Sequence, residues 1–579
     1  MKSTLTFRSS SLAALLTAAI GAWFGFNRSE PTLPLQPEST TPTLASTSPS
    51  ALPAVDSLGV DNVVPDESSA DGATVPSGKA LFAKPLHVSG QPLDLKGPAY
   101  LRAWTKGEHI VGRVAELDRE SFAAIRNVAE GDAVSIPTFD GSLAGIVEVV
   151  DTEDEGWQRI GGPLRDGRDG WFTLSFNGQE AAGLVRLTSQ RLAYDIRPAA
   201  GGALQMVERP LNDVFCEGIP RYKGSDVDAA NPFGQHRRAA AAVTTPILNS
   251  RPGAPAVFLL DFDGANINDP FWGKINARPS PLTAVQRQDV WRRVKEDFLP
   301  YNVNVTTNPA EYQAKAPGAK MRVIITPDDT AGPGSGGVAF VASFAYAGTI
   351  FKGNVPCWVF NPTVKSIADA ASHEIGHTLG LYHDGLYTPA APFEYYVGHG
   401  TGPTSWGPIM GAPYTRTLTQ WSKGEYKGAN RYEDDDEIIA GPLNAFRYAP
   451  DLVGDTPATA APLTVNSGLI EQHGVIERPG DADVFFLRVR RGGSLLISAI
   501  GLGATVGDLD LRLDLITATG LVLSKNKFLG SQGAGLSVAL GPGVHYLRVR
   551  GTGEGDVKGT GYSSYGSRGA YTIAGSAPF

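Results

Sequence analysis

Three of the nine histidines in this 579-residue chain fall within eleven consecutive positions, at His373, His377 and His383. His373 and His377 are one helical turn apart, so both imidazoles project from the same helix face and can hold one metal ion. Gly380 stands where that helix must end, because glycine readily adopts the left-handed conformation that turns the chain back. The spacing therefore predicts a metal site with three imidazole ligands.

Zinc fits this ligand set, and three protein ligands leave the fourth tetrahedral position open to water, as in catalytic sites. Glu374 lies next to the first ligand, and its carboxylate can reach that water. A carboxylate there can accept a proton from the water and later donate one to a leaving amine. We therefore expect Glu374 to be the general base. The alternative is a helix with surface histidines and a solvated glutamate.

Composition excludes other kinds of site. The chain has only two cysteines, Cys216 and Cys357, which are too few for a disulfide-rich scaffold or a thiolate zinc site. Its net charge of −9 favours neither a nucleic-acid surface nor an anionic membrane. We expect no nucleic-acid partner.

The first 28 residues are predicted to be an export signal. Lys2 and Arg8 precede an apolar run over 12–20, and a small-x-small pattern suited to signal peptidase follows. Even extended to Phe26, the run is shorter than the ~20 residues that a membrane-spanning helix needs, so an uncleaved anchor is the weaker alternative. We expect a secreted, extracellular protein, with the periplasm or the cell surface as alternatives, and no stable membrane span after signal removal.

Composition and hydrophobic patterns divide the remainder into four segments. Proline, serine and threonine dominate 29–80, which is predicted to be a disordered linker. Short alternating apolar runs predict a β-rich domain over 81–238. Strands and two long helices predict a mixed α/β domain over 239–450, and leucines alternating with charged residues predict a β-sandwich over 451–579 with the charges on its other face.

Within the α/β domain, the apolar spacing predicts helices over 284–299 and 366–379, the second begun by a capping box from Ser366 to Asp369. Apolar runs predict strands over 257–262, 302–306, 321–326, 338–344 and 358–360.

The run from His373 to Asp384 resembles the zinc signature of the metzincin metallopeptidases, and the aspartate after the third histidine resembles the adamalysin/reprolysin branch. Met410 lies 27 positions beyond His383 and resembles the Met-turn beneath the metal in that clan. The resemblance implies a mixed sheet, an active-site helix, a Met-turn and hydrolysis of peptide bonds. In related families a tyrosine two positions after the methionine assists the metal site. Ala412 stands there in this chain, and Tyr414 is either catalytic or a packing residue.

The resemblance extends to both sides of the histidines. Residues 336–341 resemble the edge strand on which metzincins lay an extended substrate, with an ordinary core strand as the alternative. Residues 455–575 resemble the bacterial pre-peptidase C-terminal (PPC) domain. Its acidic clusters at 481–483 and 508–510 predict either Ca²⁺ ligands or a solvated strand face. The acidic run 434–437 is expected to be a charged surface loop.

The β-rich domain is expected to be a prodomain, because the dibasic pair Arg237-Arg238 lies in a polar joint where cleavage would begin the mature form near Ala239. Cys216 lies upstream of that joint. A thiolate is a strong zinc ligand, so Cys216 could keep the enzyme inactive by taking the open coordination position. A disulfide with Cys357 and an inert thiol are the alternatives.

Together these patterns predict an exported zinc-dependent endopeptidase that acts on proteins or peptides. The fold is expected to be multidomain, with an α/β metzincin-like catalytic domain between a β-rich prodomain and a C-terminal β-sandwich. A zinc amidase acting on cell-wall peptides and a non-catalytic surface-binding protein are the alternative functions.

Overall fold

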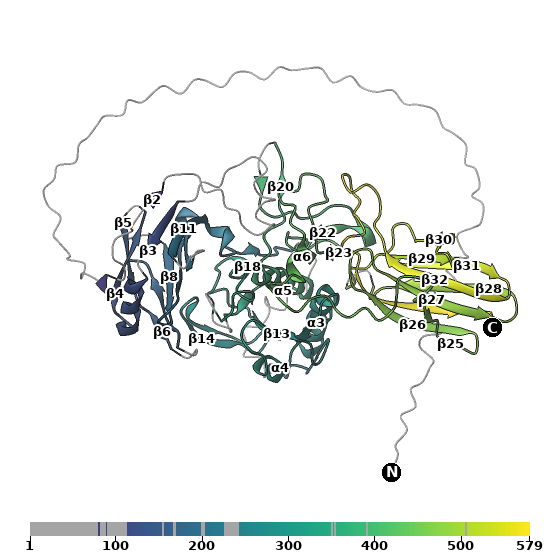
Figure 1. Cartoon of the computed structure of the whole chain (residues 1–579), viewed down its shortest axis with the longest axis horizontal. Coiled ribbons are helices and arrows are strands. Elements are labelled where there is room, and N and C mark those ends of the chain that lie inside the picture. Colours follow the sequence, from purple (N-terminus) through teal and green to yellow (C-terminus); the bar gives the residue numbers. More distant parts are fainter. Residues whose placement is uncertain are drawn as a thin grey trace, which may run out of the picture. The chain divides into compact units, whose positions relative to one another are not determined.

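The computed structural model describes residues 113–578 and the backbone of 79–80 and 88–89. Gaps fall at 118, 140, 153–155, 166–168, 199–202, 225–242, 349–350, 352–354, 390–391 and 504–505. The predicted signal and the pair Arg237-Arg238 lie outside the described residues, as does all of the predicted linker except 79–80. The described residues belong to one unit, Val75–Phe579, which is rich in strands and has few helices (Figure 1). None of the described helices has the length and apolar character needed to cross a membrane.

The N-terminal part is β-rich, as predicted. One sheet has eight strands in the order β2-β3-β11-β10-β9-β8-β7-β6, and a second has three in the order β1-β4-β5. The eight strands are β2 (Val88–Ser89), β3 (Val114–Leu117), β6 (Val149–Asp151), β7 (Gln158–Pro163), β8 (Gly170–Phe176), β9 (Ala181–Leu187), β10 (Leu192–Pro198) and β11 (Leu204–Pro210). The three are β1 (Lys79–Ala80), β4 (Ala133–Thr138) and β5 (Gly141–Ile146). Alternate residues of β4 face the core beside the 3₁₀ helix η2 (Glu120–Asn127).

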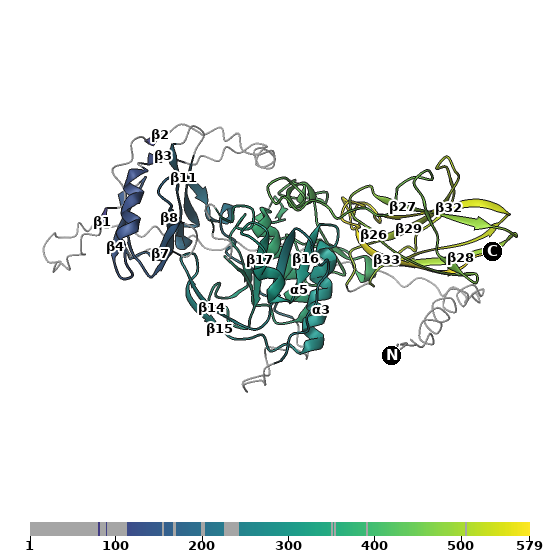
Figure 2. The same ribbon diagram turned by 60° about the horizontal axis from the view of Figure 1, so that its bottom comes forward.

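The central part is a six-stranded sheet in the order β12-β18-β19-β17-β13-β16. Its strands are β12 (Ile219–Pro220), β13 (Ala256–Asp261), β16 (Val303–Thr306), β17 (Lys320–Ile325), β18 (Ser335–Val338) and β19 (Cys357–Val359). All neighbours from β19 to β16 pair in parallel, whereas β18 is antiparallel to β19. Helices α3 (Ala284–Phe298) and α5 (Val364–Leu379) pack on each other beside this sheet (Figure 2).

Shorter elements complete the central part. They are β14 (Ala265–Asp269), β15 (Gly273–Ala277), α4 (Pro309–Gln313), β20 (Leu386–Tyr387), β21 (Pro392–Phe393), β22 (Trp406–Pro408), β23 (Leu418–Gln420) and α6 (Asp435–Ile439).

Two boundaries differ from the prediction. Helix α5 begins at Val364, because Thr363 and Ser366 exchange reciprocal side chain to backbone hydrogen bonds as the capping box, so the predicted start at Ser366 was wrong. The strand expected over 338–344 ends at Val338. Beyond it the chain turns, and the N–H groups of Ala342 and Phe344 donate to the carbonyls of His377 and Thr378 at the end of α5.

The C-terminal part has two five-stranded sheets, in the orders β24-β27-β32-β29-β30 and β25-β26-β33-β28-β31. The first contains β24 (Ala461–Pro462), β27 (Ala482–Val489), β29 (Leu511–Ile516), β30 (Val522–Asn526) and β32 (Gly543–Gly551). The second contains β25 (Val465–Asn466), β26 (Leu469–Ile476), β28 (Gly493–Ile500), β31 (Ala534–Leu540) and β33 (Gly569–Ser576). Leu511, Leu513 and Leu515 face the core as predicted.

For the aspartates that alternate with these leucines, the alternative of a solvated strand face was wrong. Asp514 is fully buried between Arg512 and Arg548, at 2.7 and 2.6 Å, and Asp510 is fully buried against Lys527. A carboxylate tolerates such burial when a cation pairs with it, and the alternation of residues in the sequence does not show the partner.

The expectation of a charged surface loop over 434–437 was also wrong, because most of this run forms helix α6 and part of it is buried. Asp434 caps α6, and the side chain of Asp436 is buried because it pairs with Arg568 at 2.7 Å. Tyr301 completes this buried network by donating its hydroxyl to Asp436, and Nη1 of Arg568 lies 3.4 Å from that hydroxyl. The network joins the end of α3, helix α6 and the start of β33.

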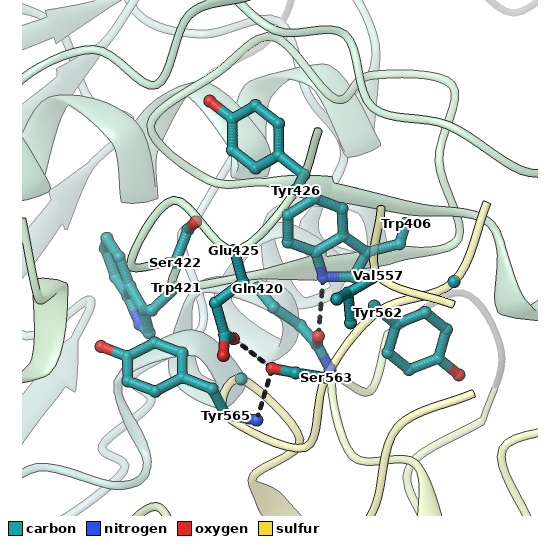
Figure 3. A pocket seen from close by; sticks show the side chains of 12 residues that line it. Trp406, Gln420, Trp421, Ser422, Glu425, Tyr426, Val557, Tyr562, Ser563 and Tyr565 are labelled. Carbon is teal, nitrogen blue, oxygen red and sulfur yellow. Dashed lines mark hydrogen bonds between the residues drawn. The ribbon is translucent and has the colours of Figure 1, made fainter. Parts of the chain in front are cut away.

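A second contact between the central and C-terminal parts surrounds a small pocket (Figure 3). Nε1 of Trp406 donates to Gln420 at 2.8 Å, and Ser563 from the C-terminal part donates to Glu425. None of the residues that line the pocket is one of the three clustered histidines or Glu374.

Candidate metal centre

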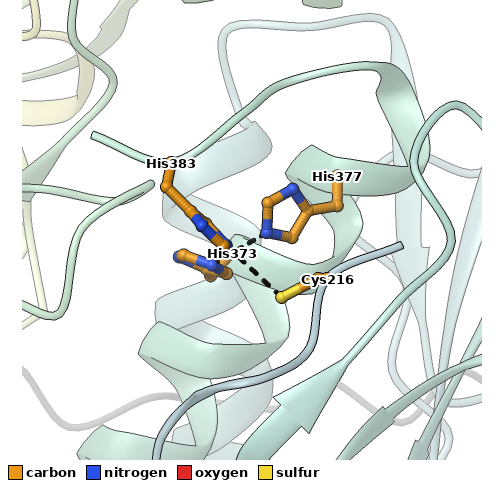
Figure 4. Close-up of side chains that lie close together, drawn as sticks. All are labelled: Cys216, His373, His377 and His383. Carbon is orange, nitrogen blue, oxygen red and sulfur yellow. Dashed lines mark hydrogen bonds between the residues drawn. The ribbon is translucent and has the colours of Figure 1, made fainter. Parts of the chain in front are cut away.

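The structure brings His373, His377 and His383 together with Cys216 (Figure 4). One side-chain atom from each of the four lies within 4.8 Å of the other three, and all four residues are buried. Helix α5 supplies the first two histidines. Gly380 ends the helix in the left-handed conformation, with φ of 107°, and the chain then returns to place His383 beside them.

Hydrogen bonds fix the protonation of the first two imidazoles. Nδ1 of His373 lies 2.8 Å from the carbonyl oxygen of Ile409, and Nδ1 of His377 lies 2.8 Å from that of Leu381. A carbonyl only accepts, so each Nδ1 carries the hydrogen and each Nε2 keeps a lone pair. The two Nε2 atoms are 3.0 Å apart, and facing lone pairs at that distance repel each other unless a cation lies against both. The site thus fits a divalent metal.

The protonation state of the three histidines also suits metal binding. Burial lowers the pKa of His373 to about 4 and lowers the pKa values of His377 and His383 well below their ordinary range. The imidazoles are therefore neutral at pH 7, which is the form that binds metal.

His383 is oriented by Glu394, a residue that the sequence analysis missed. Nδ1 of His383 donates to Oε1 of Glu394 at 3.0 Å, the usual arrangement of a carboxylate behind a metal-binding histidine. Asn212 also donates to Oε1, and Nη2 of Arg191 lies 3.3 Å from Oε2. Two residues of the N-terminal part therefore hold the carboxylate that orients His383.

Cys216 lies on the other side of His383, with Sγ 3.4 Å from Nε2. Burial and the charge of Glu374 raise the pKa of this thiol well above its usual value. Both cysteines are free and buried, so the alternative of a disulfide between Cys216 and Cys357 was wrong.

Glu374 is fully buried, and neither of its carboxylate oxygens has a hydrogen-bond partner among the described residues. Burial raises its pKa well above the usual value. Space for the carboxylate depends on Gly337 in β18, because a Cβ at that position would lie 2.7 Å from Oε1 of Glu374. An unpaired, buried carboxyl group next to the histidines is suited to exchange a proton with a molecule bound there.

Met410 is fully buried against α5. Its sulfur would lie 2.6 Å from a Cβ at Gly376, so the thioether packs on the helix backbone directly before His377. Its carbonyl accepts the N–H of Asp384 at 2.9 Å. Met410 thus supports the segment that follows the third histidine, without itself being one of the four clustered residues.

A segment of the N-terminal part, 214–220, lies along β18 and its continuation. Strand β12 pairs antiparallel with β18, the N–H of Cys216 donates to Ala339 at 2.9 Å, and the N–H of Val341 donates to Val214 at 3.1 Å. Strand β18 would otherwise form the edge of the sheet, so the chain itself covers the edge strand predicted over 336–341.

Two tyrosines face the other side of this segment. Tyr395 donates to the carbonyl of Gly218 at 2.9 Å, and Tyr414 donates to that of Pro220 at 3.0 Å. The amide of Asn361 donates to the Tyr414 hydroxyl at 2.9 Å.

An acidic cluster in the C-terminal part contains Asp451, Glu477 and Asp481, with carboxylate oxygens within 4.8 Å of one another. One oxygen each of Glu477 and Asp481 is buried without a hydrogen-bond partner among the described residues. The other acidic run, for which Ca²⁺ ligands were one alternative, has different neighbours, because Asp510 pairs with Lys527 and Asp508 lies close enough to Asp297 for its charge to raise the pKa of Asp508.

In a comparison with known proteins, one region of the chain matches a family model. Residues 286–384 match the model of the metallopeptidase family M12B, reprolysin-like. A search of proteins with curated functions finds no match. Similar solved structures include the PPC domain of collagenase from Bacillus anthracis, at 17% identity over 22% of this chain and 95% of that one, with a TM-score of 0.15. Another is metalloproteinase-II from Bacteroides fragilis, at 11% identity over 46% of this chain and 86% of that one, with a TM-score of 0.15.

The matched region starts within α3 and ends on Asp384, so it contains His373, His377 and His383. The comparison therefore confirms the resemblance of this region to the reprolysin-like metallopeptidases.

Proposed function

We propose that the chain is an exported zinc endopeptidase of the metzincin type, made as an inactive precursor. The observation that carries the proposal is the pair of Nε2 lone pairs 3.0 Å apart on His373 and His377, beside the buried and unpaired carboxyl group of Glu374. A helix with surface histidines and a solvated glutamate would have neither feature.

In the proposed reaction His373, His377 and His383 hold the metal, and Glu394 keeps His383 in its orientation. Zinc, when bound, supplies a positive charge that polarises the scissile carbonyl and makes water more acidic. Glu374 accepts a proton from the attacking water and then donates it to the leaving nitrogen. Met410 packs beneath α5 and keeps the segment after His383 in place.

The domain assignment follows the same proposal. Residues 81–238 would form the prodomain, 239–450 the catalytic domain and 451–579 a PPC-like β-sandwich. Export rests on the first 28 residues, and a secreted form is expected, with the periplasm or the cell surface as alternatives. The substrates are proteins or peptides, and an amidase acting on cell-wall peptides remains the second candidate.

Cys216 is proposed as the switch that keeps the precursor inactive. Its sulfur lies 3.4 Å from Nε2 of His383, and the segment that carries it covers β18. Cleavage near Arg237-Arg238 would free this segment from the catalytic domain.

The test of the function is metal analysis and proteolysis by the purified, processed protein. We expect one zinc per chain, casein cleavage and inhibition by phenanthroline. Glu374→Ala should retain zinc and lose ~10²- to 10⁴-fold in kcat, the usual value of a general base. Glu437→Ala, at an exposed position on α6, is the control. Peptidoglycan release without casein cleavage would favour the amidase, and unchanged kcat in Glu374→Ala would contradict the role of this residue.

The switch is tested on the full-length precursor loaded with Co²⁺. A thiolate ligand gives a near-ultraviolet charge-transfer band, which Cys216→Ala should abolish and the matched variant Cys357→Ala should retain. Cys216→Ala should also be active before processing, since the fourth ligand position opens to water. A precursor without this band would show that Cys216 is not a ligand. N-terminal sequencing of the processed form should find a start near Ala239.

A further inference from the structure

Segment 214–220 is held through its backbone from two sides. Along one side the N–H of Cys216 and the carbonyl of Val214 pair with Ala339 and Val341, which follow β18. Along the other side Tyr395 and Tyr414 donate to the carbonyls of Gly218 and Pro220. Every peptide has these backbone groups, so the same walls can receive a peptide of a different sequence.

The two tyrosines have different ring contacts, and Tyr395 is the one that contacts the histidines. The ring of Tyr395 lies on that of His383, with ring centres 4.3 Å apart, and 6.1 Å from that of His373. The carbonyl that its hydroxyl binds, that of Gly218, lies two residues after Cys216, the side chain whose sulfur is 3.4 Å from Nε2 of His383. The Tyr414 hydroxyl is engaged by Asn361, and its ring lies against Tyr222.

A substrate carbonyl that occupies the place of Cys216 gains negative charge on its oxygen during the reaction, and a hydrogen-bond donor to that oxygen would stabilise it. The imidazole N–H groups are committed, since His373 and His377 donate to backbone carbonyls and His383 donates to Glu394. Glu374 serves as a proton acceptor in the proposed reaction. Tyr395 has a hydroxyl that already donates to a peptide carbonyl, that of Gly218 two residues after Cys216, at 2.9 Å.

We propose that Tyr395 is a catalytic residue of the processed enzyme, donating a hydrogen bond to the oxygen of the scissile carbonyl after segment 214–220 has left. This proposal rests on the proposed peptidase function. Tyr414, by contrast, binds a carbonyl of the substrate away from the reacting bond.

The chemical step balances without a further reagent. The oxygen of one water bonds to the carbonyl carbon, the proton passes to Glu374, and the π electron pair moves onto the carbonyl oxygen, which Tyr395 stabilises. The C–N bond then breaks, the carbonyl re-forms, and the nitrogen takes the proton from Glu374. Tyr395 keeps its own proton throughout, because it acts as a hydrogen-bond donor to the developing negative charge.

The test compares Tyr395→Phe with the matched variant Tyr414→Phe in the processed, zinc-loaded protein obtained from the full chain. Loss of one donor to a developing oxyanion typically lowers kcat ~10²- to 10³-fold, which we expect for Tyr395→Phe with KM and zinc content little changed. Tyr414→Phe should act mainly on KM. A phosphonate peptide that mimics the tetrahedral state, measured by calorimetry, should bind Tyr395→Phe more weakly by a similar factor.

Stability is followed separately by thermal unfolding. If Tyr395→Phe is poorly folded, the comparison moves to Tyr395→Gln, which keeps a donor, and Tyr395→Leu, which does not; the first should retain more activity. If Tyr395→Phe keeps the wild-type kcat and phosphonate affinity, the role of Tyr395 is overturned and the peptidase function is not. A wild-type protein that holds zinc but cleaves no peptide would overturn the peptidase function and this proposal with it.

Discussion

Oε1 of Glu394 lies 3.0 Å from Nδ1 of His383, and the same oxygen accepts a hydrogen bond from Asn212 in the N-terminal part. One carboxylate thus connects the candidate metal centre to the part of the chain proposed to be removed. The contact makes Glu394 a positioning residue, because it acts on the metal through the orientation of His383.

Replacing Glu394 by Ala should weaken zinc binding, since loss of a carboxylate behind a metal-binding histidine typically costs 10- to 100-fold in affinity. The measurement is the apparent zinc Kd by competition with a chelator. Glu217→Ala is the matched control, because Glu217 also pairs with Arg191, at 3.1 Å. Equal zinc affinities in the two variants would show that Glu394 does not position His383.

Gly218→Ala should loosen segment 214–220 in the precursor. Gly218 has a φ of 115°, and an added Cβ would overlap the side chain of Ser335 in β18. The Cys216 thiol, buried in the wild type, should then react faster with a thiol reagent. Gly131→Ala controls for backbone strain alone, since Gly131 also has a positive φ but no atom near an added Cβ. Unchanged thiol reactivity in Gly218→Ala would contradict the prediction.

The buried carboxyl pair Asp297 and Asp508 should make stability depend on pH. Burial raises the pKa of Asp297 from 3.8 to about 7 and, with the charge of Asp297, raises that of Asp508. Between these pH values the folded chain keeps a proton that the unfolded chain has lost. The free energy of unfolding should therefore fall as pH rises from about 4 through about 7. Below that window both states are protonated and this loss is absent.

Asp508→Asn should flatten this dependence, because it removes one of the two acids whose pKa burial raises. The measurement is urea unfolding at several pH values between 4 and 8, with the exposed Asp556→Asn as control. For each proton that the folded state retains, the equilibrium constant for unfolding should rise by at most about tenfold per pH unit. A wild-type slope in Asp508→Asn would refute the assignment.

Ca²⁺ should raise the thermal stability of the full chain. Glu477 and Asp481 each have a buried oxygen without a described partner, and burial, together with Asp481, raises the pKa of Glu477 to about 9. A cation would replace that proton, and binding at 100 times Kd stabilises by about 2.7 kcal/mol. Glu477→Gln should lose most of the rise in Tm, whereas the exposed Glu471→Gln should keep it. No rise with millimolar Ca²⁺ would rule out the site.

The local parts of the candidate site could be predicted from the sequence. The i, i+4 spacing of His373 and His377 and the glycine that ends α5 both act over a few residues, so the meeting of the three histidines follows from the motif itself. The start of α5 could not be predicted from the sequence, because Thr363 and Ser366 are both good caps and only their reciprocal bonds decide between them.

Long-range partners could not be predicted. Glu394 and Tyr395 follow β21, where no periodicity marks a function, and their partners include Asn212 and Gly218, which lie 182 and 177 residues away along the chain. The same applies to Asp436, for which surface exposure is the ordinary expectation of an acidic run. Its burial depends on Arg568, which lies far along the chain and cannot be matched to it from the sequence alone.

The network of Tyr301, Asp436 and Arg568 has a consequence for synthesis of the protein. Asp436 and Arg568 are separated by 132 residues (568 − 436), which a ribosome adds in roughly 7 to 26 s at ~5–20 residues per second. During that time the buried carboxylate of Asp436 lacks its cation, and an unpaired buried charge strongly opposes burial. This network therefore completes its packing only when translation has almost finished, so a nascent chain that ends before Arg568 would be incompletely folded around Asp436.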